Sequence, residues 1–543
     1  MESSKKLLIY QVLPRLFGSC PVENTPNGTI AQNGCGKFND FDNHVLRRIR
    51  QMGFTHVWYT GVIRHATTTD YTAYGLPPQH PAIVKGRAGS PYAIVDYYDV
   101  DPDLAVDVPR RMDEFQALLD RTHKAGLKVF IDFVPNHVAR QYHSTAKPAD
   151  VADLGQNDDT TKHFSLQNNF YYCWGQPLEP TFDIGTYREQ PARATGNDHF
   201  DNRPGPTDWY ETVKLNYGID YCDAGGRSSH FVPVPDTWHK MTAILQFWAS
   251  KGIDGFRCDM AEMVPTSFWN HAIAKVKQQH SDLLFIAEVY NPALYREYLA
   301  AGFDLLYDKV GMYDSLRDIV CHRRPATDIT RQWQQTDDIR DHMLYFLENH
   351  DEQRIASDFF AGNPRRALPA VAVALLLGTN PYMHYAGQAL GEPGMQTEGF
   401  SGLDGRTTIF DYWRLDSLRR AFFDRRHLRP EERELEQAYT NLLSMASLPA
   451  IANGQLFDLM YANPASEQFN PDTTYVFLRK APNSQMLLIA VNFADEPVEC
   501  RIVVPEHAFH TLHIVAAHPA TPIEVAIEPY GISIVEVKVE ENK

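Results

Sequence analysis

Cysteine is scarce in this 543-residue chain, and its seven copies include no CxxC pair. An odd number of cysteines without such spacing argues against both a disulfide framework and a zinc site. The N-terminal stretch also lacks the apolar core and the small-residue cleavage site of a signal peptide. We therefore expect reduced thiols and a cytoplasmic location.

Long hydrophobic runs and an excess of positive charge are absent as well. The longest apolar stretch, 367–378, contains a proline and is too short to span a bilayer, so we interpret it as a buried helix. Lys and Arg number 51 against 68 Asp and Glu, a formal net charge of −17. This balance argues against nucleic acid or an anionic membrane as a partner, but it is compatible with a neutral ligand. The sequence leaves the oligomeric state open.

What the sequence does contain is a recurring unit, a short apolar strand followed by an amphipathic helix. Continuous apolar strands that alternate with helices indicate parallel pairing with both faces buried. About eight such units favour an α/β fold, a (β/α)₈ TIM barrel, with a doubly wound open sheet as the alternative. The predicted strands cover 7–13, 56–59, 127–134, 253–258, 283–289, 303–307, 343–347 and 381–385.

Two segments interrupt this alternation. Residues 139–235 are rich in Asn, Asp, Pro, Gly and Tyr, and a structureless loop of that length is unlikely in a compact domain. We therefore predict a small inserted domain there, between a first barrel part over 1–138 and a second over 236–440. Alternating strand patterns over 441–543 predict a C-terminal antiparallel β-sandwich domain.

Chemically active side chains follow four of the predicted strands. In a barrel, the active site forms where the strands end and the loops begin. A single Asp or His at such a place is usually a helix cap or a packed core residue, but four strands ending this way favour one shared site. The four segments read DFVPNH (132–137), GFRCD (255–259), FIAEV (285–289) and ENHD (348–351).

Two of these carboxyl groups suit glycoside hydrolysis. Retaining glycosidases need a nucleophile and an acid/base about 5–5.5 Å apart, and Asp259 and Glu288 end adjacent predicted strands. Arg257 lies two residues before Asp259, hence on the same face, where a cation keeps a nucleophile ionised. Asp351 is a third carboxylate, suited to stabilising an oxocarbenium-like centre.

In order and spacing, the four segments resemble the four signature regions of the alpha-amylase superfamily of retaining glycoside hydrolases. Further stretches resemble that family's first strand (IYQVLPRLFG), the loop before its second barrel helix (SPYAIVDYYDVDP) and its eighth strand (NPYMHYAGQALGEPG). The resemblance implies a TIM-barrel catalytic domain with an inserted domain after the third strand and a C-terminal β domain.

The resemblance also implies roles for individual residues. Asp259 is implied as the nucleophile, Glu288 as the acid/base and Asp351 as the transition-state stabiliser. Asn136 is implied as a ligand of a structural calcium ion, and no organic cofactor is implied. The implied contacts of the scissile sugar are Tyr92, which matches an aromatic platform, together with His137, Arg257 and His350. Asp132 is implied to brace the site.

Two segments depart from the family pattern. Many amylases place Lys-His two residues after the nucleophile, whereas this chain continues Met260-Ala261-Glu262-Met263. The motif before Leu-Asn at the end of the inserted domain usually contains Asp, whereas Lys214 stands here. Both departures bear on the calcium site, and the first also bears on the acceptor side of the substrate.

The expected activity is alpha-amylase-like hydrolysis of α-1,4-glucans or maltooligosaccharides, such as starch or glycogen fragments, through a covalent glycosyl-enzyme intermediate. An α-glucan transglycosylase, or an α-glucosidase-like enzyme acting on short oligosaccharides, is the alternative, because the same intermediate serves transfer. A non-catalytic glucan binder is disfavoured because all three carboxylates are present. Tyr171, Tyr172 and Trp174 belong either to substrate subsites or to the core of the inserted domain.

Overall fold

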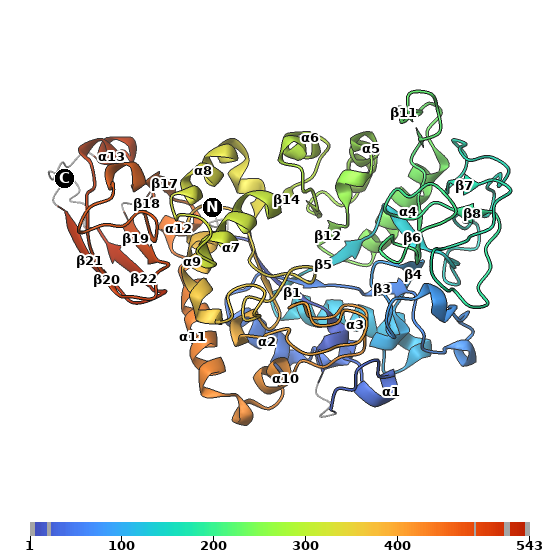
Figure 1. Ribbon diagram of the computed structural model, residues 1–543, viewed down its shortest axis with the longest axis horizontal. Coiled ribbons are helices and arrows are strands. Elements are labelled where there is room, and N and C mark those ends of the chain that lie inside the picture. The colour runs from blue at the N-terminus through green and yellow to red at the C-terminus, as the bar shows by residue number, and fades with distance from the viewer. Residues whose placement is uncertain (1–5, 19–22, 483–484, 515–521, 538–543) are drawn as a thin grey trace.

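Eight parallel strands form the centre of the protein (Figure 1). The computed structural model describes residues 6–18, 23–482, 485–514 and 522–537. Strands follow the order β15-β14-β13-β12-β5-β2-β1-β16, and a parallel bridge between Tyr345 and Tyr382 closes the circle. The barrel strands are β1 (Leu8–Val12), β2 (His56–Tyr59), β5 (Lys128–Phe133), β12 (Gly255–Cys258), β13 (Leu284–Ala287), β14 (Leu305–Tyr307), β15 (Met343–Leu344) and β16 (Tyr382–Tyr385). The predicted barrel is confirmed, and the open-sheet alternative is wrong.

Burial on both faces explains why these strands read as continuous apolar runs. Every residue of β1, β2 and β12 is buried. Ile9, Trp58, Phe130 and Ile286 form one cluster from four different strands, while the other faces of the strands pack against the surrounding helices. Side chains on the inner faces and on the outer faces of the strands therefore both stabilise the barrel by removing apolar surface from water.

Helices follow most of the strands and surround the barrel. The predicted buried helix over 367–378 is confirmed as α9, whose residues are all buried and which contacts β19 and β22 of the C-terminal sheet. The helices are α1 (Ile30–Asn33), α2 (Asn43–Gln51), α3 (Arg111–Lys124), α4 (Asp236–Ser250), α5 (Thr266–Lys277), α6 (Tyr295–Ala300), α7 (Asp314–Val320), α8 (Asp328–Gln335), α9 (Leu368–Leu376), α10 (Asp416–Phe422), α11 (Pro430–Met445), α12 (Pro449–Ala452) and α13 (Glu506–Thr511). None of the described helices is long and apolar enough to cross a bilayer.

The segment after β5 contains little regular structure and projects at one end of the molecule (Figure 1). A buried carboxylate organises part of it, because Glu189 pairs with Arg140 at 2.8 Å and with Arg193 at 2.9 Å. Its short strands are β6 (His137–Ala139), β7 (Tyr172–Cys173), β8 (Ala192–Arg193), β9 (Thr212–Lys214), β10 (Ile219–Asp220) and β11 (Ser228–Ser229), which pair antiparallel as β6-β9, β7-β8 and β10-β11. Strands β3 (Ile63–His65) and β4 (Ile94–Val100) form a further antiparallel pair.

An antiparallel β unit lies at the opposite end of the molecule (Figure 1). Its four-stranded sheet has the order β17-β18-β19-β22, and the β20-β21 ribbon packs beside it. The strands are β17 (Gln455–Asp458), β18 (Thr474–Lys480), β19 (Met486–Asn492), β20 (Val498–Ile502), β21 (Ile523–Ile527) and β22 (Ile532–Glu536). Buried Arg479 on β18 donates to the carbonyl of Leu377, and thereby ties the sheet to the barrel. The predicted boundary at residue 440 falls inside helix α11, which continues to Met445.

Candidate active site

A single buried arginine connects the two carboxyl groups that were predicted to share the chemistry. Arg257 lies on β12, where its neighbour on β13 is Ile286, so the residues after both strands emerge at the same end of the barrel. Its Nη1 lies 2.8 Å from Asp259 Oδ1, and its Nη2 lies 2.8 Å from Glu288 Oε1. The guanidinium therefore fixes both carboxylates relative to each other and compensates their charge.

Glu288 has two further partners. The backbone N–H of Met260 donates to Oε2 at 2.7 Å, and the hydroxyl of Tyr290 donates to Oε1 at 2.6 Å. Sequence reasoning missed Tyr290. The signal was its position two residues after Glu288, the same spacing that identified Arg257 beside Asp259.

Asp351 follows β15 and is held by the imidazole of His350. Gln11 donates from Nε2 to His350 Nδ1 at 2.7 Å, which leaves the proton on Nε2. That nitrogen lies 2.9 Å from Asp351 Oδ2 and 2.5 Å from the hydroxyl of Tyr92. The Tyr92 ring stacks on His350, with centroids 5.3 Å apart. Three predicted site residues thus form one connected group.

Asp132 braces this group from below. Its Oδ2 accepts from Trp58 Nε1 and from the backbone N–H of Gly61, both at 3.1 Å. Its Oδ1 accepts from the Tyr92 hydroxyl at 3.3 Å and lies 3.5 Å from Arg257 Nη1. Asp132 therefore orients Arg257, which contacts Asp259 and Glu288, and Tyr92, which contacts His350.

Asp259 and Asp351 experience different electrostatic environments. Burial raises the pKa of Asp259 well above its usual range; Arg257 opposes this rise, and the nearby charges of Glu288 and Asp351 add to it. Burial also acts to raise the pKa of Asp351, but His350 and Arg257 outweigh it and hold that pKa below its usual value. Asp351 is thus kept ionised, which suits a residue that stabilises positive charge.

Replacing His350 with Gln should raise the pKa of Asp351. The substitution removes the group that does most to lower that pKa, so the carboxylate takes up a proton at higher pH than in the wild type. The measurement is a carbon-13 NMR titration of the aspartate side-chain carboxyls, with Asp351→Asn to assign the signal, because the acidic limb of kcat/KM follows the higher pKa of Asp259. An Asp351 pKa that is unchanged in the variant would contradict this coupling.

A cavity of about 350 Å³ lies above these groups. Tyr92, His137, Asp259, Glu288 and Asp351 line it, so five predicted site residues share one space. Arg257 and His350 lie beneath it and act through the carboxylates that they contact. The lining residues that sequence reasoning missed come from the ends of β12 and β13, from other loops and from the inserted segment: Met260, Tyr290, Lys85, Ser90, Trp209, Glu211, Thr212, Ile409 and Phe410.

His137 enters the cavity as a neutral imidazole. Burial, helped by the nearby ammonium groups of Lys214 and Lys85, lowers the pKa of His137 to about 3. The ring therefore carries no charge at any ordinary working pH and interacts with a ligand as a neutral hydrogen-bonding group. Trp209 packs beside it with ring centroids 5.3 Å apart.

The arrangement around Asn136 does not fit a calcium ion. Its Oδ1, the atom that would ligate calcium, accepts from the ammonium of buried Lys214. The same ammonium lies 2.7 Å from Asp198 Oδ1 and 3.5 Å from the carbonyl of Met263. A calcium ion prefers six to eight oxygen ligands, and a buried ammonium among these oxygens would repel it. Lys214 thus links the loops after β5 and β12 to the inserted segment.

Replacing Lys214 with Met should lower the free energy of unfolding by about 3 kcal/mol, because it leaves buried acceptors without their cation. Denaturant titration measures this change. Lys162→Met is the matched control, since that lysine forms an exposed pair with Asp159 in the same segment and should contribute less than about 1 kcal/mol.

We also expect EDTA to leave the wild-type melting temperature unchanged. A melting temperature that falls in EDTA and recovers with added calcium would contradict the conclusion that the residues around Asn136 do not bind calcium.

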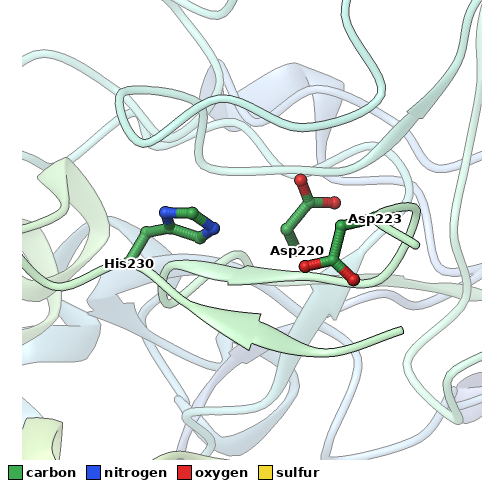
Figure 2. Close-up of side chains that lie close together, drawn as sticks. All are labelled: Asp220, Asp223 and His230. Atoms are coloured by element: carbon green, nitrogen blue, oxygen red, sulfur yellow. The ribbon is translucent and has the colours of Figure 1, made fainter. Parts of the chain in front are cut away.

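A possible metal-binding group lies elsewhere, on the β10-β11 hairpin. Figure 2 shows Asp220, Asp223 and His230, whose ligand atoms lie within 4.8 Å of one another. Hydrogen bonds of the hairpin already use these side chains. Asp220 accepts from the N–H of Cys222, Asp223 accepts from that of Ser228, and His230 contacts the Ser228 hydroxyl at 2.7 Å. The cluster is accounted for by the folding of the turn.

The aromatic residues at the start of the inserted segment have two different environments. Tyr171 and Tyr172 are buried, and their hydroxyls donate to the carbonyl of Ile219 and to Asp158. Trp174 is 67% exposed and is not among the residues lining the 350 Å³ cavity. The two tyrosines therefore belong to the core of the segment, as one of the two interpretations predicted.

Comparisons with known proteins agree on one family. The model of the alpha-amylase catalytic domain matches residues 32–429. Alpha-amylase 3 of Dictyoglomus thermophilum is 23% identical over 341 residues, and neopullulanase 2 of Thermoactinomyces vulgaris is 20% identical over 406; these matches cover 61% and 72% of this chain. This chain spans 58% of the length of each relative. Among solved structures, the Geobacillus thermoleovorans alpha-amylase complexed with acarbose matches with a TM-score of 0.64 and 18% identity, over 100% of both chains. This last likeness supports the fold alone.

Proposed function

Because this chain belongs to the alpha-amylase family, we propose that it hydrolyses α-1,4-linked glucans or maltooligosaccharides with retention of the anomeric configuration. One observation carries the proposal: Arg257 pairs at 2.8 Å with both Asp259 and Glu288, at the edge of a cavity that Asp351 also lines. Two carboxyl groups held in this way supply the nucleophile and the acid/base of a double displacement.

In the first step, protonated Glu288 gives its proton to the glycosidic oxygen while Asp259 attacks the anomeric carbon. The bond between that carbon and the oxygen breaks, and the leaving sugar departs as an alcohol. Asp351, kept ionised by His350, lines the same cavity and favours the positive charge that develops on the sugar ring. Neutral His137 and the ring of Tyr92 line the cavity and orient the sugar.

In the second step, Glu288 is a carboxylate and takes a proton from water, which attacks the anomeric carbon and releases Asp259. Tyr290 and the N–H of Met260 hold Glu288 in place for both proton transfers. Two inversions at the same carbon give net retention. The names of the similar proteins, an alpha-amylase and a neopullulanase, support an α-glucan as the substrate.

The test is the time course of maltoheptaose cleavage, followed by proton NMR and chromatography. We expect the α-anomer to appear first, with shorter sugars and a rising number of reducing ends. First appearance of the β-anomer would refute retention. Longer sugars at a constant number of reducing ends would assign transfer in place of hydrolysis, and an unchanged substrate would refute the proposed substrate class.

A further inference from the structure

A buried ion pair lies in the wall of the catalytic cavity. Lys85 Nζ lies 2.8 Å from Glu211 Oε1, with side-chain exposures of 12% and 4%. Both residues line the cavity that contains Asp259 and Glu288. None of the steps described above uses this pair, although it is charged, desolvated and adjacent to the reacting groups.

Three separate segments bring the pair together. Lys85 belongs to the loop between β3 and β4, Glu211 directly precedes β9 of the inserted segment, and Phe410 comes from the loop after β16. The ammonium of Lys85 lies 5.7 Å from the ring centre of Tyr210 and 5.9 Å from that of Phe410. The pair is thus a bridge between the barrel and the inserted segment, held between aromatic rings.

The hydrogen-bonding capacity of this bridge is only partly used. Glu211 Oε2 is buried and has no hydrogen-bond partner among the residues that the structure describes. Within the same described set, the pair with Glu211 is the single polar contact of the Lys85 ammonium, which has three donors. A buried acceptor without a partner is destabilising. A ligand hydroxyl that donates to Glu211 would remove this penalty.

We propose that Lys85 and Glu211 form a hydroxyl-binding subsite for a glucosyl ring, and that this subsite selects neutral α-glucans; the inference rests on the proposed function. An ammonium beside a carboxylate offers a donor and an acceptor next to each other, which matches two neighbouring hydroxyl groups. The negative charge of Glu211 disfavours a phosphate or carboxylate substituent at the same place. Aromatic Trp209 and Phe410 line the same cavity and supply flat apolar faces.

The experiment measures kcat, KM and melting temperature on maltotetraose for the wild type, Lys85→Met, Glu211→Gln and the double variant. Loss of a hydrogen bond to a charged group should lower kcat/KM by about 10- to 100-fold in each single variant, mainly through KM. The kcat/KM of the double variant should be little lower than that of the more impaired single variant, because both residues serve one contact. The matched control is the Lys277→Met and Asp304→Asn pair, an ion pair at 2.7 Å outside this cavity, which should leave both constants unchanged.

The outcomes separate the subsite from the activity itself. An inactive wild type would overturn the proposed function, whereas an active wild type with unchanged kcat/KM in both variants would overturn the subsite alone. A lower melting temperature with unchanged KM would assign the pair to the structure of the wall. Glu211→Gln should turn over a 6-phosphorylated maltooligosaccharide faster than the wild type does, because the variant lacks the charge that disfavours the phosphate. A wild type that prefers the phosphorylated sugar to the neutral one would overturn the selection of neutral glucans and assign Lys85 to an anionic substituent.

Discussion

Asp259→Asn is expected to lower kcat on maltooligosaccharides by about 10⁴- to 10⁶-fold, the range found when an enzyme loses its nucleophile. The amide is close in size to the carboxylate and can stay near Arg257, whose Nη1 lies 2.8 Å from Asp259 Oδ1 in the wild type. It cannot form the ester with the anomeric carbon. Binding of the substrate should persist, because the remaining residues that line the cavity are unchanged.

The intermediate itself gives a second readout for this variant. Incubation of the wild type with 5-fluoro-α-D-glucosyl fluoride should add one glycosyl unit to the peptide that contains Asp259, as detected by mass spectrometry. Asp259→Asn should show no adduct. Asp254→Asn is the matched control, because Asp254 precedes the same strand at the opposite end of the barrel and pairs with His123 at 2.8 Å. An adduct on another residue would assign the nucleophile elsewhere.

The barrel and its catalytic carboxylates follow from local sequence patterns. Strands buried on both faces are mostly apolar, so β1, β5 and β12 stand out without any knowledge of the fold, although each also carries a polar residue (Gln11, Asp132 and Arg257). Asp259 and Glu288 directly follow such strands, and a barrel brings all strand ends to one side. Their approximate positions were therefore predictable, although their link through the two Nη atoms of Arg257 was not.

The walls of the cavity were not predictable in the same way. Lys85 and Glu211 are far apart in the sequence and lie on segments without a periodic pattern, so only the folded chain shows that they form an ion pair. Lys214 was visible as a departure from the family pattern. Its role as a buried cation that links three loops could be recognised only from the positions of its partners, Asn136, Asp198 and Met263. Long-range pairing of loop residues depends on the whole fold and leaves no local signal.

Glu288→Gln should lower kcat on maltooligosaccharides by about 10²- to 10⁴-fold, the usual contribution of general acid–base catalysis. The amide cannot give a proton to the glycosidic oxygen, and its single oxygen can replace only one of the two carboxylate oxygens that accept from the N–H of Met260 and the hydroxyl of Tyr290. The loss should depend on the leaving group. With α-maltosyl fluoride, fluoride departs without protonation, so formation of the intermediate should proceed at nearly the wild-type rate.

The second step then separates Glu288 from residues that only bind the sugar. Without a base for water, the glycosyl-enzyme should accumulate from α-maltosyl fluoride, and added azide should release it as α-maltosyl azide because azide needs no base. Glu297→Gln on α6, which accepts from Thr266, is the matched control and should show neither effect. Equal losses on both substrates without azide rescue would contradict acid/base catalysis by Glu288 and would reduce its role to holding Arg257 beside the nucleophile.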